Sequence, residues 1–181
     1  EPPRITEPEK DVEVSVDEFE SQSLTCSASG IPKPSITWKR ETPTGQDIYR
    51  RWSACQHQPN EAIGTGNLMI IRNTSRECGG VYICEAMSSV LPNAIRKFHV
   101  KVRFPPEIHL DNDRLSQGLG KDTVLSCTIS GFPKSLVYWE FNGKQISQAS
   151  DIAEKYSVEV YEPEEEKVGI LLTIKNLQYK D

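Results

Sequence analysis

The residues of this chain that could do chemistry by type and spacing are its cysteines. Two of them stand six positions apart in the segment RECGGVYIC, residues 76–84. A cysteine can join a disulfide, bind a metal ion as a thiolate, or stay a free thiol. The partners of these side chains therefore decide what kind of protein this is. The five cysteines are Cys26, Cys55, Cys78, Cys84 and Cys127.

A metal site is one alternative for part of this set. Its ligands would be Cys55, His57 and Cys78, which are only three and lack the C-x-x-C spacing of a zinc knuckle. Two free thiols, Cys55 and Cys78, are the other alternative to a disulfide. We expect no metal, because the ligand set is incomplete.

Catalytic constellations are missing from the sequence. There is no G-x-S-x-G, no Ser/His/Asp set in a nucleophile context and no phosphate-binding loop. The formal net charge of −5 argues against nucleic acid, which is bound largely through cationic surfaces. We therefore expect no enzyme, no catalytic residues, no cofactor and no nucleic-acid partner. No apolar run approaches the roughly 20 residues of a membrane span, so any membrane attachment would lie outside this segment.

An internal repeat organises the chain. LTCSASGIPKPSITWKR at residues 24–40 aligns with LSCTISGFPKSLVYWEF at residues 125–141, and in both a tryptophan follows the cysteine by twelve positions. LMIIRNTSREC at residues 68–78 likewise matches LLTIKNLQYKD at residues 171–181. The alternation of apolar and polar residues around each cysteine and tryptophan is typical of strands. The sequence thus predicts an all-β protein of two tandem units, residues 1–103 and 104–181.

The repeat resembles the immunoglobulin family. Its pattern is a strand B cysteine, a strand C tryptophan about twelve residues later, and G-x-Y-x-C in strand F. In the first unit these are Cys26, Trp38, Tyr82 and Cys84, and in the second Trp139 is the core tryptophan. The resemblance implies two β-sandwiches of the I-set type, each with a disulfide through the core, on which the tryptophan packs.

The resemblance also implies how the cysteines pair. Cys26 is expected to bond Cys84. Cys78 stands where such domains place an aspartate that pairs with a basic residue near strand D, and the second unit keeps this aspartate as Asp181. We expect a bond from Cys78 to Cys55 in place of that ion pair. The match to the pattern stops at Asp181, just before the expected strand F, so we expect the second sandwich to lack strands F and G here and the natural protein to continue.

The similarity can be narrowed to one branch. PPRI at residues 2–5, VRFPPEIHL at residues 102–110 and GFPKSLVYW at residues 131–139 resemble the second and third domains of lachesin, Dpr-interacting proteins and IgLON proteins. These are cell-surface adhesion and recognition proteins, many of them neuronal. The resemblance implies an extracellular, non-catalytic binding or spacer module whose partners are other cell-surface immunoglobulin proteins. The alternatives are a receptor or secreted decoy for a growth factor or glycan, and a muscle-type structural array.

A glycosylation sequon and a basic and aromatic cluster are candidate surface sites. Asn73, in the sequon Asn-Thr-Ser, is a candidate for glycosylation in an oxidising, secretory compartment. Arg50, Arg51 and Trp52 form the basic and aromatic cluster of the chain, a candidate interface because arginine and tryptophan are enriched at binding hot spots. A tryptophan that covers the second disulfide is the alternative.

Overall fold

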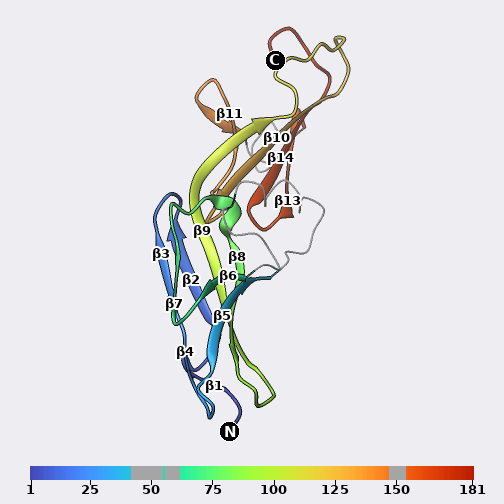
Figure 1. Cartoon of the computed structure of the whole chain (residues 1–181). Helices are drawn as coiled ribbons and strands as arrows, with labels where there is room; N and C mark the ends of the chain where they lie inside the picture. Colours follow the sequence, from blue (N-terminus) through green and yellow to red (C-terminus); the bar gives the residue numbers. More distant parts are fainter. Residues whose placement is uncertain (42–54, 56–61, 147–153) are drawn as a thin grey trace. The chain divides into compact units, whose positions relative to one another are not determined.

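The structure is a computed structural model that describes residues 1–41, 55, 62–146 and 154–181. The chain divides into two compact units, Glu1–Arg103 and Phe104–Asp181, here called unit 1 and unit 2. Strands dominate both units, and in the described part of the chain the one helical element is a short 3-10 turn, η1 (Arg76–Cys78). Figure 1 shows the strands of both units, coloured along the sequence.

Unit 1 is built from two layers of strands. One layer has the order β6-β5-β8-β9, with β2 added in parallel on β9, and the other contains the pairs β1-β4 and β3-β7. Strand β9 runs on into unit 2. The strands are β1 (Arg4–Glu7), β2 (Val12–Asp17), β3 (Gln22–Thr25), β4 (Ser27–Ser29), β5 (Ser35–Arg40), β6 (Ala62–Thr65), β7 (Leu68–Ile71), β8 (Gly80–Met87) and β9 (Ala94–Leu110).

The core of unit 1 lies between these layers. Strands β5 and β8 alternate between buried and half-buried residues, so each turns one face to the opposite layer. The even-numbered side chains Ile36, Trp38, Tyr82 and Cys84 are buried, whereas their odd-numbered neighbours face outward. Burial of these side chains is the main contribution that holds the two layers together.

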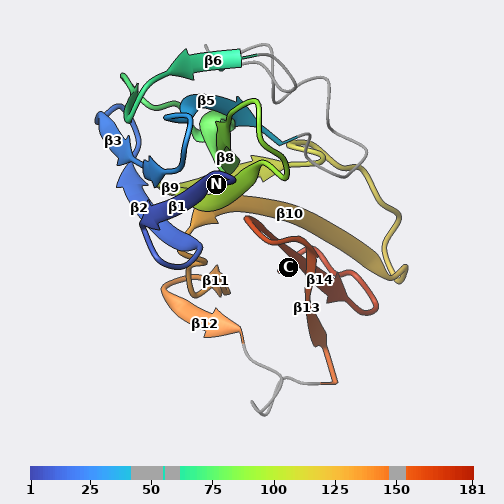
Figure 2. The same ribbon diagram turned by 60° about the horizontal axis from the view of Figure 1, so that its bottom comes forward.

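Unit 2 contains one four-stranded sheet and one short strand pair. The sheet has the order β9-β10-β14-β13, and β11 pairs with β12 (Figure 2). Trp139 packs against both apolar clusters of this unit, one around Cys127 and Ile170 and one around Leu172. The strands are β10 (Thr123–Phe132), β11 (Trp139–Phe141), β12 (Lys144–Ile146), β13 (Tyr156–Glu164) and β14 (Lys167–Ile174).

The repeated Ser-Gly dipeptide has the same structural use in both units. A Cβ added to Gly131 would lie 3.1 Å from Cα and 3.3 Å from N of Pro106. A Cβ added to Gly30 would lie 3.3 Å from Pro3 Cα. In each unit the missing side chain of this glycine allows the Pro-Pro segment, Pro2-Pro3 or Pro105-Pro106, to pass close to the backbone at the glycine.

Replacing Gly131 by alanine is expected to destabilise unit 2 by about 1–2 kcal/mol, because the nearest atoms belong to a rigid proline ring and its backbone. Chemical denaturation of the full chain measures the change. Gly118→Ala is the matched control, since its added Cβ would meet only Lys121 Cγ at 3.7 Å. Equal stability of the two variants would contradict the close approach.

Candidate functional site

A disulfide crosses the core of unit 1. It joins Cys26 to Cys84 over a sequence separation of 58, with 6.5 Å between the Cα atoms. Trp38 is directly opposite Cys84 in the pairing of β5 with β8 and is 0% exposed. Its indole Nε1 donates a hydrogen bond to Gly66 O at 2.8 Å, and its ring lies 5.3 Å from that of Phe98. The polar atom of this large side chain is thereby satisfied inside the core.

A second disulfide and a tyrosine fix the turn η1. Cys55 is bonded to Cys78 over a separation of 23, and both residues are buried. The hydroxyl of Tyr82 donates to Cys78 O at 2.7 Å. Burial raises the pKa of Tyr82 to about 12, and the charge of Arg40 opposes that rise. The tyrosine is therefore neutral and able to donate over the whole physiological range.

Arg40 is a further residue at this turn, and the sequence reasoning missed it. Its side chain is buried and donates to the backbone oxygens of Glu77 at 2.5 Å and Gly79 at 2.7 Å. The guanidinium also lies 5.7 Å from the centre of the Tyr82 ring. Burial lowers the pKa of Arg40. The sequence did contain a signal for its burial. Side chains alternate along the strand, and Arg40 stands two residues after Trp38 and four after Ile36, on the side that faces the core.

The equivalent corner of unit 2 uses an ion pair. Lys155 Nζ lies 2.6 Å from Asp181 Oδ2, and the hydroxyl of Tyr156 donates to Asp181 Oδ1 at 3.3 Å. The hydrogen bond from Lys155 lowers the pKa of Asp181. In the internal alignment Asp181 corresponds to Cys78, so one unit closes this corner covalently and the other electrostatically.

The structure describes two of the three ligands considered for a metal site, and it does not describe the basic cluster. Cys55 and Cys78 are joined to each other, and a disulfide sulfur is not the thiolate that binds zinc. His57, Arg50, Arg51 and Trp52 lie outside the described residues. No group of three or more His, Cys, Asp or Glu side chains gathers as a metal site within the described ranges.

Asn73 lies at the turn that follows β7. It is exposed and has a φ of 47°, and Asn176 at the matching position of unit 2 has a φ of 50°. Asparagine tolerates this left-handed conformation better than most residues, which gives both asparagines a structural reason. Thr74, the next residue of the sequon, is fully buried. The Asn73 side chain remains accessible for a glycan.

Unit 2 has a hollow on the inner face of its larger sheet. It has a volume of about 440 Å³ and is lined by Ile108, Leu110, Cys127 and Trp139, among others. Cys127 is buried and forms no disulfide within the described part of the chain, and desolvation raises the pKa of its thiol. The indole nitrogen of Trp139 is buried without a hydrogen-bond partner among the described residues.

The stability of unit 1 is expected to depend on the ionisation of Tyr82. Its pKa is about 10 in the unfolded chain and about 12 in the fold. The stabilisation is therefore complete below pH 10 and is lost as the pH rises through 12. Tyr82→Phe should cost about 1–2 kcal/mol at neutral pH, through the lost hydrogen bond, and should flatten the alkaline decline. Denaturation midpoints between pH 7 and 12 measure both effects. An undiminished alkaline decline in the variant would contradict the assignment.

Comparison with known proteins places these observations in a family. The sequence pattern of the Immunoglobulin domain matches residues 2–88. The chain is 34% identical over 128 residues to lachesin of Schistocerca americana, an alignment that covers 68% of this chain and 32% of lachesin. The chain belongs to the immunoglobulin superfamily. The expected all-β fold of immunoglobulin-like sandwiches is thereby confirmed.

Two more relatives give the extent of the similarity. Limbic system-associated membrane protein of Gallus gallus is 27% identical over 151 residues, which is 83% of this chain and 40% of that protein. The solved structure of Dpr2 Ig1-Ig2 in complex with DIP-Theta Ig1-Ig3 matches with a TM-score of 0.80 and 27% identity, over 99% of this chain and 57% of that one. This immunoglobulin chain thus spans less than half of each of the two named relatives.

In immunoglobulin terms β5, β8 and β9 of unit 1 are strands C, F and G. Their odd-numbered side chains form an outer face that is half-buried to exposed. Ile83 lies between Lys39 and Lys97 in the strand register, and Ile95 is 52% exposed. Two ion pairs cross this face, Lys39 to Glu85 at 2.9 Å and Lys97 to Glu41 at 3.1 Å. We call this surface the outer CFG face.

In addition, the described residues include no helix that is both long and apolar enough to span a membrane.

Proposed function

We propose that the chain is an extracellular segment of a cell-surface recognition or adhesion protein. It acts without catalysis, either by binding other cell-surface immunoglobulin proteins or by spacing a recognition domain from the membrane. The two disulfides of unit 1 carry the proposal, because such bonds persist in oxidising compartments and are rare in the cytosol. Lachesin and the Dpr2 and DIP-Theta complex support the class of partner. On this proposal units 1 and 2 are the second and third domains of the longer protein.

The outer CFG face is the surface we assign to partner binding within this segment. Lys39 and Lys97 of this face are already paired with Glu85 and Glu41, so a partner need not supply compensating charges for them. Ile83 and Ile95 provide apolar area at the centre and margin of the face. This combination of apolar area and satisfied charges is typical of protein interfaces.

Immobilised full chain, presented to a panel of cell-surface immunoglobulin ectodomains and to itself, tests this assignment. We expect binding to at least one of them and loss of that binding in Ile95→Glu. Val124→Glu, a change of the same kind at a residue of unit 2 that is 54% exposed, is the matched control and should bind normally. Binding that survives Ile95→Glu would move the partner to another surface, and no binding at all would favour a spacer role.

The compartment is tested on the protein isolated from its own tissue, with free thiols blocked by alkylation at lysis. Mass spectrometry without reduction should find the Cys26 to Cys84 and Cys55 to Cys78 peptides linked, and removal of N-glycans should lower the mass of the peptide that contains Asn73. A muscle-type structural array would instead have reduced cysteines and no glycan. A receptor or decoy for glycans would be retained on heparin at physiological salt, which we do not expect from an acidic chain.

A further inference from the structure

Strand β2 forms an open edge of the larger sheet of unit 1. It pairs with β9 in parallel, and no strand of the described residues pairs with its other side. The N–H of Glu18, just after β2, donates to Arg103 O in β9. Because backbone N–H groups alternate sides along a strand, those of Glu13 and Ser15 face the open side. An unpaired edge of this kind is a template for another strand.

An apolar hollow lies beside this edge. It forms because β1 pairs with β4 in one layer while β2 pairs with β9 in the other, so the chain between Glu7 and Val12 has to cross from layer to layer. The hollow has a volume of about 380 Å³, enough for a bulky aliphatic or aromatic side chain. Its lining residues are Glu7, Pro8, Val12, Val14, Ser23, Leu24, Thr25 and Phe98.

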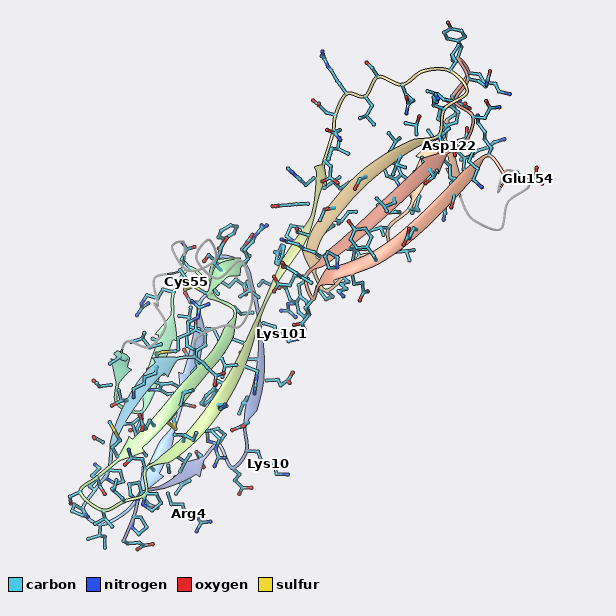
Figure 3. All side chains as sticks on the ribbon, turned by 90° about the vertical axis from the view of Figure 1, so that its right-hand side faces the viewer. Arg4, Lys10, Cys55, Lys101, Asp122 and Glu154 are labelled. Atoms are coloured by element: carbon cyan, nitrogen blue, oxygen red, sulfur yellow. A yellow bond between two sulfur atoms is a disulfide. The ribbon has the colours of Figure 1, made fainter. Side chains whose placement is uncertain are left out.

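The segment that contains the edge strand is rich in acidic residues, although Lys101 and Arg103 lie opposite it on β9. Residues 7–20 include seven acidic side chains and a single basic one, Lys10, which Figure 3 shows at the turn after β1, directed away from unit 1. Three of the seven have partners in the fold: Asp17 pairs with Arg103, Glu18 with Arg76, and Asp11 accepts the N–H of Lys97. The other four are exposed and form no ion pair among the described residues; they are Glu7, Glu9, Glu13 and Glu20.

These charges decide which kind of strand fits the edge. A second copy of the chain would bring its own Glu13 and Glu9 against those of the first, and like charges on adjacent strands are destabilising. An extended segment rich in lysine or arginine would meet the unpaired carboxylates instead. If such a segment carries one bulky apolar side chain, the hollow beside Val12 and Val14 can receive it.

We propose that β2 and the adjoining hollow bind an extended, basic segment of a partner protein by strand addition. Main-chain hydrogen bonds to the Glu13 and Ser15 edge would supply affinity, while the carboxylates and the hollow would select alternating basic and apolar side chains. This surface, which we call the β2 edge site, comprises Glu7, Val12, Glu13, Val14 and Ser15. It is separate from the outer CFG face and rests on the proposed function only in that both need a protein partner.

A fluorescent peptide in which lysine alternates with valine is the probe, titrated with the full chain and followed by anisotropy. We expect saturable binding that weakens with added salt. The double variant Glu7→Lys/Glu13→Lys should reduce the affinity about tenfold or more, because it reverses two charges at the contact. Glu159→Lys, on the edge strand β13 of unit 2, is the matched control and should bind as the wild type does.

Hydrogen exchange separates strand addition from loose electrostatic attraction. The N–H of Ser15 should exchange more slowly with the peptide bound, whereas a peptide in which glutamate replaces lysine should neither bind nor protect it. Both variants change exposed side chains, and equal melting temperatures show that they are folded. The proposal is overturned if the peptide does not bind saturably, if Glu159→Lys loses as much affinity as the double variant, or if Ser15 is not protected. It is also overturned if sedimentation shows that the chain forms a dimer through this edge. None of these results bears on Ile95→Glu, which tests the outer CFG face.

Discussion

Trp38→Ala is expected to lower the free energy of unfolding of unit 1 by about 4 kcal/mol, a large part of the stability of a domain of this size. The indole is fully buried between the two layers, opposite Cys84 and against Phe98. Its removal leaves a cavity at the centre of the core and strips the Gly66 carbonyl of its hydrogen bond. Chemical denaturation of the full chain with both disulfides intact measures the change.

Leu91→Ala is the matched control for this prediction. Leu91 belongs to the same unit but is 74% exposed, so its truncation should change the stability by no more than about 0.5 kcal/mol. A loss below about 1 kcal/mol in Trp38→Ala would mean that the layers are held together elsewhere.

The sequence was sufficient for the features that depend on local pattern. Alternation of side chains along SITWKR and GVYICEAM predicts strands with one buried face, and β5 and β8 have that pattern. The all-β class and the immunoglobulin architecture follow from such segments, because a cysteine, a tryptophan and a second cysteine on facing strands fit few other arrangements.

Features that depend on contacts between distant segments could not be predicted in the same way. The parallel pairing of β2 with β9 joins residues 12–17 to residues 98–103, and nothing in VEVSVD specifies the direction of its partner. The inward position of Arg40 follows from the alternation along β5, but its acceptors could not be predicted, since Glu77 O and Gly79 O are backbone atoms of a distant segment. The hollow beside β2 results from that pairing and was invisible for the same reason.

The two units of the internal repeat differ at the corner that contains Cys78 in unit 1 and Asp181 in unit 2. Unit 1 fixes η1 with a disulfide, the Tyr82 hydroxyl and Arg40, whereas unit 2 uses the pair of Lys155 and Asp181 at the equivalent place. An ion pair that is partly exposed contributes about 1 kcal/mol or less and weakens with salt. A disulfide does not depend on salt or on pH in this way. The corner of unit 1 is therefore the more durable one in an oxidising environment.

The double variant Cys55→Ala/Cys78→Ala is expected to destabilise unit 1 by about 3 kcal/mol, the loop-closure entropy of a bond over a separation of 23. The hydrogen bonds that the Tyr82 and Arg40 side chains donate at η1 can persist in the variant, because their acceptors are backbone oxygens. Denaturation under non-reducing conditions measures the loss, with Cys127→Ala in unit 2 as the control that should leave unit 1 unchanged. A loss well below 1 kcal/mol would show that the tyrosine and the arginine already hold this turn without the disulfide.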